Sequence, residues 1–482
     1  MIPFSLLSQD KNITIINTDT TIANANKHPE YWKLLGNVVF MHNNTKMFCD
    51  SAYHFLNKNK IKAFGKIVIN QGDSIMLYGE GLTYYGDANN IEIKKNVKLI
   101  DKSMTLSTQL LNYNIQSNIG YYPNKGIIKD RNKIIESKNG KYYSHKHKFI
   151  FKDSVILKET NHTILTNNMH YLVSNQTILF FGPSYIISNN KTIYCEKGWY
   201  NTNTNISQFE ENNYVLTKNY ILKGDSLYYN QNTKYGKAIN NIEMIDTTQN
   251  ITIFGNLAEY FENKEITQIS KSPYLQLIKN SDTLFVSAKL FIHKKTQKEQ
   301  MISAYNNVKL FKKNLQGKCD SLTYNMSKIK MMNKPILWTE EYQITADTIE
   351  IFTTNNDIEK IILKKNPMII AKEDSIDYNQ IKGKEIIIFF KEGKIYKMDI
   401  VSNGKSILVV NDEKNKIGLN YIESSQISIL FKNNKINEIT YKSTPISITT
   451  PYKDIQEKNR FLKGFVSRYY ERPLKKEDIF TE

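Results

Sequence analysis

The sequence is poor in several features, and each shortage excludes a class of structure. Only 3 of its 482 residues are cysteine, too few for a disulfide framework. No apolar run approaches the roughly 18 residues that a membrane-spanning helix needs. Arginine occurs at Arg131, Arg460, Arg468 and Arg472 alone, so lysine carries nearly all of the formal charge of +18. Because arginine is scarce and no RNA- or DNA-binding module is recognised, we expect no nucleic-acid partner.

Residues that support catalysis are also sparse. His145 and His147 lie close together in SHKHK without a neighbouring cluster of cysteines or carboxylates, so we expect no metal site. Asp-Ser and Asp-Thr pairs recur along the whole chain, at Asp50, Asp73, Asp153, Asp225, Asp282, Asp320, Asp347 and Asp374. Such recurrence favours local capping of turns over catalysis. We therefore expect a protein that is not an enzyme and that carries no cofactor.

A short motif is repeated along the chain. GDSLYYN at Gly224–Asn230 returns as CDSLTYN at Cys319–Asn325, and degenerate copies begin with a small residue, the anchor. Anchors lie at Cys49, Gly79, Ser107, Ser137, Thr166, Cys195, Gly224, Gly255, Ser287, Cys319 and Ala346, with looser copies at Gly383 and Ser424. Their spacing is 27 to 32 residues as far as Ala346, then 37 and 41. Such regular spacing indicates stacked structural repeats.

Each repeat is predicted to be β-structure. Apolar and aromatic residues alternate with period two, as at Leu227 and Tyr229, and polar turn clusters such as NQNTK follow them. The prediction is an all-β, elongated stack of about 13 repeats, each of roughly 27–41 residues, without a helical layer. Residues 13–453 are expected to form the repeats, looser from about 375, and 454–482 a tail or cap. Residues 1–12 are either the remnant of a signal peptide or a disordered start.

The positions three and five residues after the anchor are expected to share one face of the stack. The candidate lining residues are Leu82, Tyr84, Leu110, Met169, Tyr171, Leu227, Tyr229, Leu290, Leu322, Tyr324 and Ile349. From these residues alone, the apolar stripe is either a closed core or an open groove that accepts lipid.

The three cysteines, Cys49, Cys195 and Cys319, each occupy an anchor, five and then four repeats apart. Disulfide partners need Cα atoms within about 7 Å, whereas five layers span at least roughly 24 Å at the strand spacing. The sequence therefore predicts three free, buried thiols.

One stretch resembles a known family. The run from Gly36 to Asp101, with CDSAY, AFG followed by INQGD, and LYG, is similar to the OstA-like family of Bacteroidetes-type bacteria. Later matches are FFGP, YCEKGWYN, GDSLYYN and the closing KGF and ERPLKKEDIF between Lys463 and Phe480. The family is related to LptA-type lipopolysaccharide transport proteins and to the N-terminal domain of LptD.

The resemblance implies an open β-jellyroll, or β-taco, whose apolar trough shields the acyl chains of lipopolysaccharide. It implies a non-catalytic bridge in outer-membrane assembly, located in the periplasm or at the periplasmic face of the outer membrane. A full signal peptide is not recognised at the start of the sequence, where it is missing or truncated. The expected partners are lipopolysaccharide or a related amphiphile, Lpt-type membrane proteins that dock on exposed strand edges, and further copies of the chain stacked head to tail. The alternative is a β-solenoid scaffold or interaction protein without lipid cargo.

Overall fold

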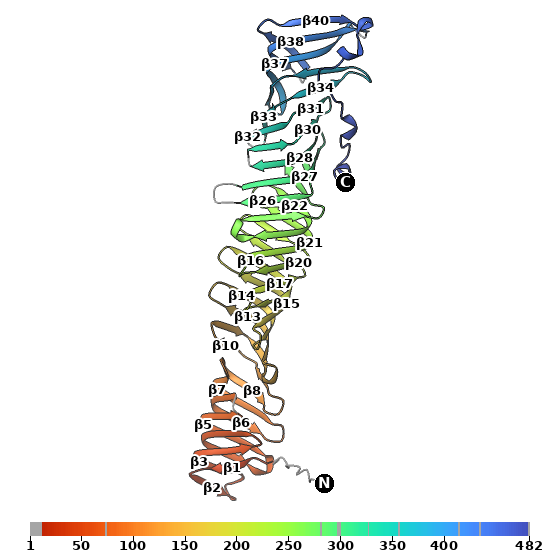
Figure 1. Ribbon diagram of the computed structural model, residues 1–482. Coiled ribbons are helices and arrows are strands. Elements are labelled where there is room, and N and C mark those ends of the chain that lie inside the picture. The colour runs from red at the N-terminus through yellow and green to blue at the C-terminus, as the bar shows by residue number, and fades with distance from the viewer. Residues whose placement is uncertain are drawn as a thin grey trace, which may run out of the picture. The chain divides into compact units, whose positions relative to one another are not determined.

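The computed structural model describes residues 12–72, 75–279, 282–295, 300–325, 327–354, 357–412, 415–432 and 435–480. Most of these residues lie in antiparallel strands, and the helical segments among them are short 3-10 turns (Figure 1). The predicted all-β fold is confirmed. Asp73 lies outside the described residues, as do residues 1–11 of the expected N-terminal segment 1–12.

The strands form two compact units. Unit 1 contains Met1–Lys218 and Asp225–Thr233, and unit 2 contains Asn219–Gly224 and Lys234–Glu482. The strands of unit 1 are β1 Thr14–Asn17, β2 Thr20–Asn24, β3 His28–His42, β4 Thr45–Phe55, β5 Lys60–Gln71, β6 Ile75–Tyr85, β7 Asn90–Asp101, β8 Met104–Asn114, β9 Ile119–Tyr122, β10 Gly126–Asp130, β11 Lys133–Ser137, β12 Asn139–Tyr143, β13 Lys148–Lys158, β14 Thr163–Leu172, β15 Thr177–Ile187, β16 Lys191–Asn201, β17 Ile206–Glu210, β18 Tyr214–Thr217 and β20 Ser226–Asn230. Its short 3-10 turns are η1 Leu56–Lys58 and η2 Ser144–Lys146.

Unit 2 continues with the same kind of strand. Its strands are β19 Tyr220–Lys223, β21 Tyr235–Asp246, β22 Ile251–Phe261, β23 Ile266–Ser270, β24 Tyr274–Lys279, β25 Asp282–Ser287, β26 Leu290–Lys295, β27 Gln300–Lys312, β28 Leu315–Asn325, β29 Lys328–Met332, β30 Ile336–Trp338, β31 Tyr342–Thr345, β32 Thr348–Thr354, β33 Asp357–Lys364, β34 Met368–Lys372, β35 Tyr378–Lys382, β36 Glu385–Lys391, β37 Lys394–Asp412, β38 Asn415–Lys432, β39 Lys435–Lys442 and β40 Ile446–Pro451. Its 3-10 turns are η3 Glu262–Lys264, η4 Tyr452–Asp454, η5 Glu457–Asn459, η6 Tyr469–Glu471 and η7 Lys476–Ile479.

Long strands bend in the middle, and these bends divide the β-sheet of each unit into two walls. In β6 the buried side chains are Ile75 and Leu77 before the bend but Leu82 and Tyr84 after it, so the alternation shifts by one residue. The pairing of β6 with β7 is interrupted at the same place. We call this line of bends the corner. Wall A runs from the corner to turns such as 43–44 and 102–103, and wall B runs from the corner to turns such as 86–89.

Pairs of consecutive residues with φ between 45 and 74° form the corner in alternate strands. These pairs are Gly36–Asn37, Lys95–Asn96, Asp153–Ser154, Glu211–Asn212, Asn240–Asn241, Lys271–Ser272, Asn306–Asn307, Asn333–Lys334, Lys365–Asn366, Ser402–Asn403 and Ser443–Thr444. Asparagine and glycine suit this left-handed conformation better than most residues do. Proline follows several pairs directly, at Pro273, Pro335, Pro367 and Pro445, where the chain re-enters a strand.

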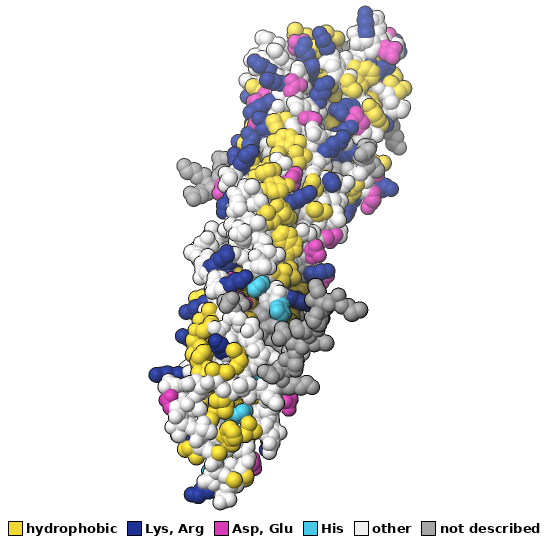
Figure 2. Space-filling model, turned by 60° about the horizontal axis from the view of Figure 1, so that its bottom comes forward, with side chains coloured by type: hydrophobic (Ala, Val, Ile, Leu, Met, Phe, Trp, Pro, Cys, Tyr) yellow, Lys and Arg dark blue, Asp and Glu magenta, His cyan; other side chains and the backbone are white. Residues whose placement is uncertain are grey.

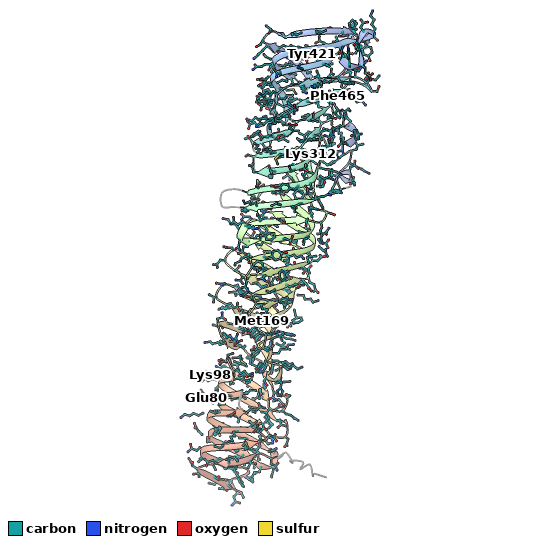
Figure 3. The ribbon with its side chains drawn as sticks, in the orientation of Figure 1. Glu80, Lys98, Met169, Lys312, Tyr421 and Phe465 are labelled. Atoms are coloured by element: carbon teal, nitrogen blue, oxygen red, sulfur yellow. The ribbon has the colours of Figure 1, made fainter. Side chains whose placement is uncertain are left out.

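Neighbouring strands hold each corner through a repeated set of hydrogen bonds. The backbone N–H of Asp347 donates to the carbonyl of Lys365 at 2.9 Å, and the Asn366 amide donates to the Asp347 carboxylate at 3.2 Å. The same carboxylate contact joins Asn37 to Asp19, Asn96 to Glu80 and Asn333 to Asp320; Glu80 is labelled in Figure 3. The recurrent acidic residues at these positions therefore cap backbone turns.

After β40 the chain leaves the repeat and returns along unit 2 as a tail, residues 452–480 (Figure 1). Three buried glutamines bind its backbone or side chains: Gln380 contacts Arg460 O and Leu462 N, Gln343 contacts Val466 O and Arg468 N, and Gln316 accepts from Arg472. Because Gln343 faces the tail, its buried neighbour Ile344 faces the interior. The tail therefore covers the outer face of wall A in unit 2, with Leu462 and Phe465 packed on it; Phe465 is labelled in Figure 3.

Replacement of Gly65 by alanine tests the corner. Gly65 has φ +76°, and a Cβ there would lie 2.2 Å from the Asp50 carboxylate. We expect Gly65→Ala to lower the free energy of unfolding by about 1–2 kcal/mol or more, because a left-handed conformation is costly for alanine. Gly81→Ala, where φ is not positive and no atom lies within 4 Å, is the matched control and should change it little. Equal urea midpoints for the two variants would contradict this account.

Candidate functional site: the apolar interior and its seam

Most of the predicted lining residues face the interior between the walls. Leu82, Tyr84, Met169, Tyr171, Leu227, Leu322 and Ile349 are buried, and Met169 is labelled in Figure 3. Tyr229 and Tyr324 lie on the same face of their strands as Leu227 and Leu322 but are only half-buried. The stripe at anchor plus three and plus five is thus largely an interior face.

The prediction was wrong for Leu110 and Leu290. Both are half-buried, and their neighbours Leu111 and Phe291 occupy the interior instead. The cause is the position of the bend, which falls one residue later in these repeats than the sequence motif suggested. In the repeat that contains Leu110, the bend places the anchor at Thr108 instead of Ser107. Thr108 lies 29 residues from both neighbouring anchors, Gly79 and Ser137.

The interior is filled by side chains from both walls. In unit 1, buried residues of wall A include Phe40, Met47, Ile69, Leu77, Leu99, Leu106, Ile128, Ile135 and Leu157, and those of wall B include Leu34, Ile61, Leu82, Ile93, Leu111, Phe149 and Phe151. A small, mainly apolar pocket of about 10 Å³ lies in unit 2, lined by Ile381, Ser406, Leu408, Ile427, Ile429, Ile436, Ile439 and Tyr441. This volume has room for about one water molecule, so the pocket is far too small for a ligand.

Where the free edges of the two walls of unit 1 meet, tyrosines form a row that we call the seam. Tyr84, Tyr113, Tyr142, Tyr171 and Tyr200 follow one another at 29-residue intervals along wall B. The Tyr113 hydroxyl donates to Gln71 at 2.8 Å, and the Tyr171 hydroxyl donates to Asp130 at 2.6 Å. The Tyr142 hydroxyl donates to Asp101, and the Tyr84 hydroxyl is hydrogen-bonded to His42 Nδ1. Each partner lies on wall A, 41 or 42 residues earlier in the chain.

Burial governs the ionisation of this row. It raises the pKa of Tyr113 to about 12. The pKa values of Tyr142 and Tyr171 are also raised, first by burial and then by the hydrogen bonds to Asp101 and Asp130. Below these pKa values the hydroxyls stay protonated, so at neutral pH each remains a donor to its partner on wall A.

A charged cluster continues the seam beyond Tyr171. Lys133 is 3% exposed, and its ammonium lies 3.3 Å from Gln176 Oε1 and 3.8 Å from Glu159. His162 Nε2 lies 3.5 Å from the other Glu159 oxygen, and the His162 ring packs edge-on against Tyr200. Burial raises the pKa of Glu159, against the effect of Lys133, and lowers the pKa of His162.

A similar polar contact crosses between the walls in unit 2. Asp246 of wall A accepts from Gln300 of wall B at 2.5 Å, and Gln300 also contacts His293. Burial alone would raise the pKa of Asp246, but hydrogen bonds from Thr248, Gln300 and Gln249 bring it below its ordinary value. Asp246 therefore stays ionised at neutral pH.

The wall A partners in the seam were missed at the sequence level. His42, Gln71, Asp101, Asp130 and Glu159 differ in residue type, which conceals the pattern. Their positions follow the repeat period, however, with intervals of 29 or 30 residues. A search for polar residues at that period, just before each hairpin turn, would have found them.

The two closely spaced histidines belong to this region as well. His145 contacts the Asn118 amide at 2.6 Å, and His147 lies 3.6 Å from Asp101. Within the described ranges, no group of three or more His, Cys, Asp or Glu side chains is arranged to hold a metal ion. The histidines therefore contribute to the turns of wall B.

Outer faces carry exposed apolar residues among lysines. Phe48, Tyr185 and Leu216 on wall A of unit 1 are each about 40% exposed (39%, 40% and 40%). Figure 2 shows hydrophobic side chains in patches between Lys and Arg side chains on the face in view. Scattered exposed apolar side chains are common on protein surfaces, so these patches alone identify no ligand.

The residues that form the repeats, the corner and the apolar interior of unit 1 also match a known protein family. Residues 10–165 and 152–225 match the OstA-like protein family. This part of the chain is similar to the OstA-like family. The OstA-like region thus covers the corner, the seam and the interior of unit 1.

Among solved structures, the chain is similar to LptH of Pseudomonas aeruginosa, described as the LptA-homologous periplasmic component of the lipopolysaccharide transport device. The likeness covers 28% of this chain and 95% of LptH, with 13% identity and a TM-score of 0.22. No curated protein matches the sequence. In the part of the chain that the structure describes, no helix is long and apolar enough to cross a membrane.

The predicted free thiols are confirmed, since Cys49, Cys195 and Cys319 are unpaired and buried. Burial raises the pKa of each to about 12. We expect no reaction with a disulfide-forming reagent at pH 8 while the protein is folded, because the thiolate is the reactive form. All three should react in guanidinium chloride. Rapid labelling of any thiol in the folded protein would contradict the prediction.

Proposed function

We propose that this protein is a non-catalytic carrier of lipopolysaccharide or a related amphiphile, acting as a bridge in outer-membrane assembly. The observation that carries the proposal is the apolar interior that continues from repeat to repeat within the OstA-like region. The proposed location is the periplasm or the periplasmic face of the outer membrane. Lpt-type membrane proteins are the proposed partners, in keeping with the family resemblance of the sequence.

The physical basis of carriage is burial of acyl chains between the walls. Each Å² of apolar surface removed from water contributes about 25 cal/mol. A long apolar lining can therefore hold several acyl chains without one dedicated pocket. Because side chains such as Met169 and Phe180 already fill the interior, cargo requires the walls to separate.

The filled interior also favours a second candidate, a scaffold or interaction protein without lipid cargo. On this hypothesis Leu82, Met169 and their neighbours are simply the core of a rigid stack. The outer faces would then bind the partner. The two candidates differ in one respect that can be measured, namely whether lipid contacts interior residues.

Photo-crosslinking can make that measurement. Phe180 is 1% exposed and faces the interior, whereas the adjacent Phe181 is 42% exposed on the outer face. We expect benzoylphenylalanine at position 180 to crosslink purified lipopolysaccharide on illumination, because acyl chains would pack against it. Crosslinked product is detected by mass shift on a gel and by immunoblotting.

The variant at position 181 is the matched control, since it has the same residue type in the same strand. Crosslinking at 180 and not at 181 supports the carrier. Crosslinking at neither position, or at 181 alone, contradicts internal carriage and favours the scaffold.

We also propose that the chain docks through terminal strands, either on further copies or on membrane partners. In unit 1, β1 and β2 both pair with β3, and Ile16 and Ile22 are exposed. In unit 2, β39 and β40 both pair with β38, and Ile446 and Ile448 are 59% and 55% exposed. Exposed apolar edge strands readily pair with another chain.

The double variant Ile446→Lys, Ile448→Lys tests this docking. We expect self-association to weaken about tenfold or more, because lysine on an edge strand opposes further pairing. Sedimentation velocity over a range of concentrations measures the effect. Leu430→Lys, at a 39% exposed site inside β38, is the control. Self-association that is unchanged in the double variant would exclude this end as the docking site.

A further inference from the structure

The corner and the seam of unit 1 are held together in different ways. At the corner, continuous strands such as β5, β6 and β7 pass from one wall to the other, and hydrogen bonds between neighbouring strands add to the covalent link. At the seam the chain turns back on each side, so no strand among the described residues of unit 1 crosses it. The contacts described there are between side chains, or from a side chain to a turn, as from Gln71 to the Ile115 carbonyl at 2.7 Å. Separation of the walls therefore breaks fewer bonds at the seam than at the corner.

The seam bonds are also of a kind that can exchange partners. Tyr113, Tyr142 and Tyr171 each donate a hydroxyl to a polar group on the opposite wall. The acceptors, Gln71, Asp101 and Asp130, can accept equally from a hydroxyl or amine of a ligand. When such a ligand replaces tyrosine, the number of hydrogen bonds is conserved while the walls part.

Unused hydrogen-bonding atoms lie along the same line. Asp101 Oδ1, Glu159 Oε1 and His162 Nε2 are buried and make no hydrogen bond in the described structure. Buried polar atoms of this kind are uncommon in folded proteins and call for an explanation. Together with the ammonium of Lys133, they provide acceptors and a cation just where the two walls meet.

We propose that the seam of unit 1 is a lateral gate through which acyl chains enter the interior, and that the tyrosine pairs are its latches. The inference rests on the proposed carrier function and adds the route of entry to it. As the latches open, the acceptors of wall A bind hydroxyl groups of the amphiphile head, and its acyl chains pass between the walls. The ligand class is therefore an amphiphile with several hydroxyl groups on its head and flexible acyl chains.

Loosening the latches without altering the interior tests the gate. In the full-length protein, the double variant Tyr142→Phe, Tyr171→Phe keeps both rings and removes both hydroxyls. Uptake of cis-parinaric acid, whose fluorescence rises in apolar surroundings, is followed after rapid mixing. We expect uptake to be about tenfold faster, because two bonds that hold the gate closed are lost.

The matched control is Tyr194→Phe. The Tyr194 hydroxyl donates to Glu196 at 2.8 Å, which is the same tyrosine–carboxylate chemistry in unit 1 but within β16 and away from the seam. Its uptake rate should equal that of the unmodified protein. Thermal unfolding of each variant verifies that the fold is retained. If the double variant does not fold, Tyr113→Phe, which faces the neutral Gln71, replaces it with an expected increase of about threefold.

The outcomes separate the gate from the carrier. Faster uptake in the seam variant alone supports the gate. If the unmodified protein takes up the probe but the seam variant is no faster, or if Tyr194→Phe is equally fast, the gate is wrong and the carrier stands. If purified protein takes up neither cis-parinaric acid nor lipopolysaccharide, the carrier proposal fails, and the gate fails with it.

Discussion

The corner is the constraint on which the rest of the structure depends. A β-sheet of this composition has one apolar face, which must be covered. Here the sheet covers itself, because strands bend at left-handed pairs such as Lys95–Asn96 and bring two halves of the same face together. The carboxylates of Glu80, Asp320 and Asp347 hold the asparagines of the neighbouring strand in that conformation. Without the bend, Leu77 and Leu82 would lie on an open sheet and could not share one core.

The corner also explains why the seam differs from the rest of the molecule. Folding a sheet along one line leaves two free edges, and in unit 1 these meet through tyrosine hydroxyls and a few charged groups. Hydrogen bonds of this type each contribute only about 0.5–1.5 kcal/mol net, or somewhat more when charged. The proposed carriage of lipid in a filled interior requires one line that is easier to open than the others. The seam combines weak closure with polar groups that a hydrophilic head can satisfy.

Unit 2 shows that the same walls can be covered from outside as well. The tail binds wall A through Gln343 and Gln380, which each donate to and accept from its backbone, and through Gln316, which accepts from the Arg472 side chain. This covering accounts for the continuous burial of Ile336–Trp338, which alternation alone would not give. In unit 1, by contrast, wall A residues such as Phe48 and Tyr185 remain exposed.

The sequence by itself determined the repeat, its β-structure, most of the interior face and the isolation of Cys49, Cys195 and Cys319. These features depend on local periodicity, which is visible in any one repeat. Local periodicity does not determine the position of the bend to within one residue. A shift of one residue places Leu111 inside in place of Leu110.

The tertiary structure decided the seam, the path of the tail and the division into two units. Each tyrosine contact of the seam joins residues 41 or 42 positions apart, across two walls whose stagger no single repeat records. The tail has no periodic sequence pattern. The tail residues that contact Gln343 are separated from it by 123 and 125 residues in the sequence. The local alternation of apolar residues determines which face of a strand is buried. Which residues of the two free edges come into contact depends instead on how far neighbouring strands are offset along the corner.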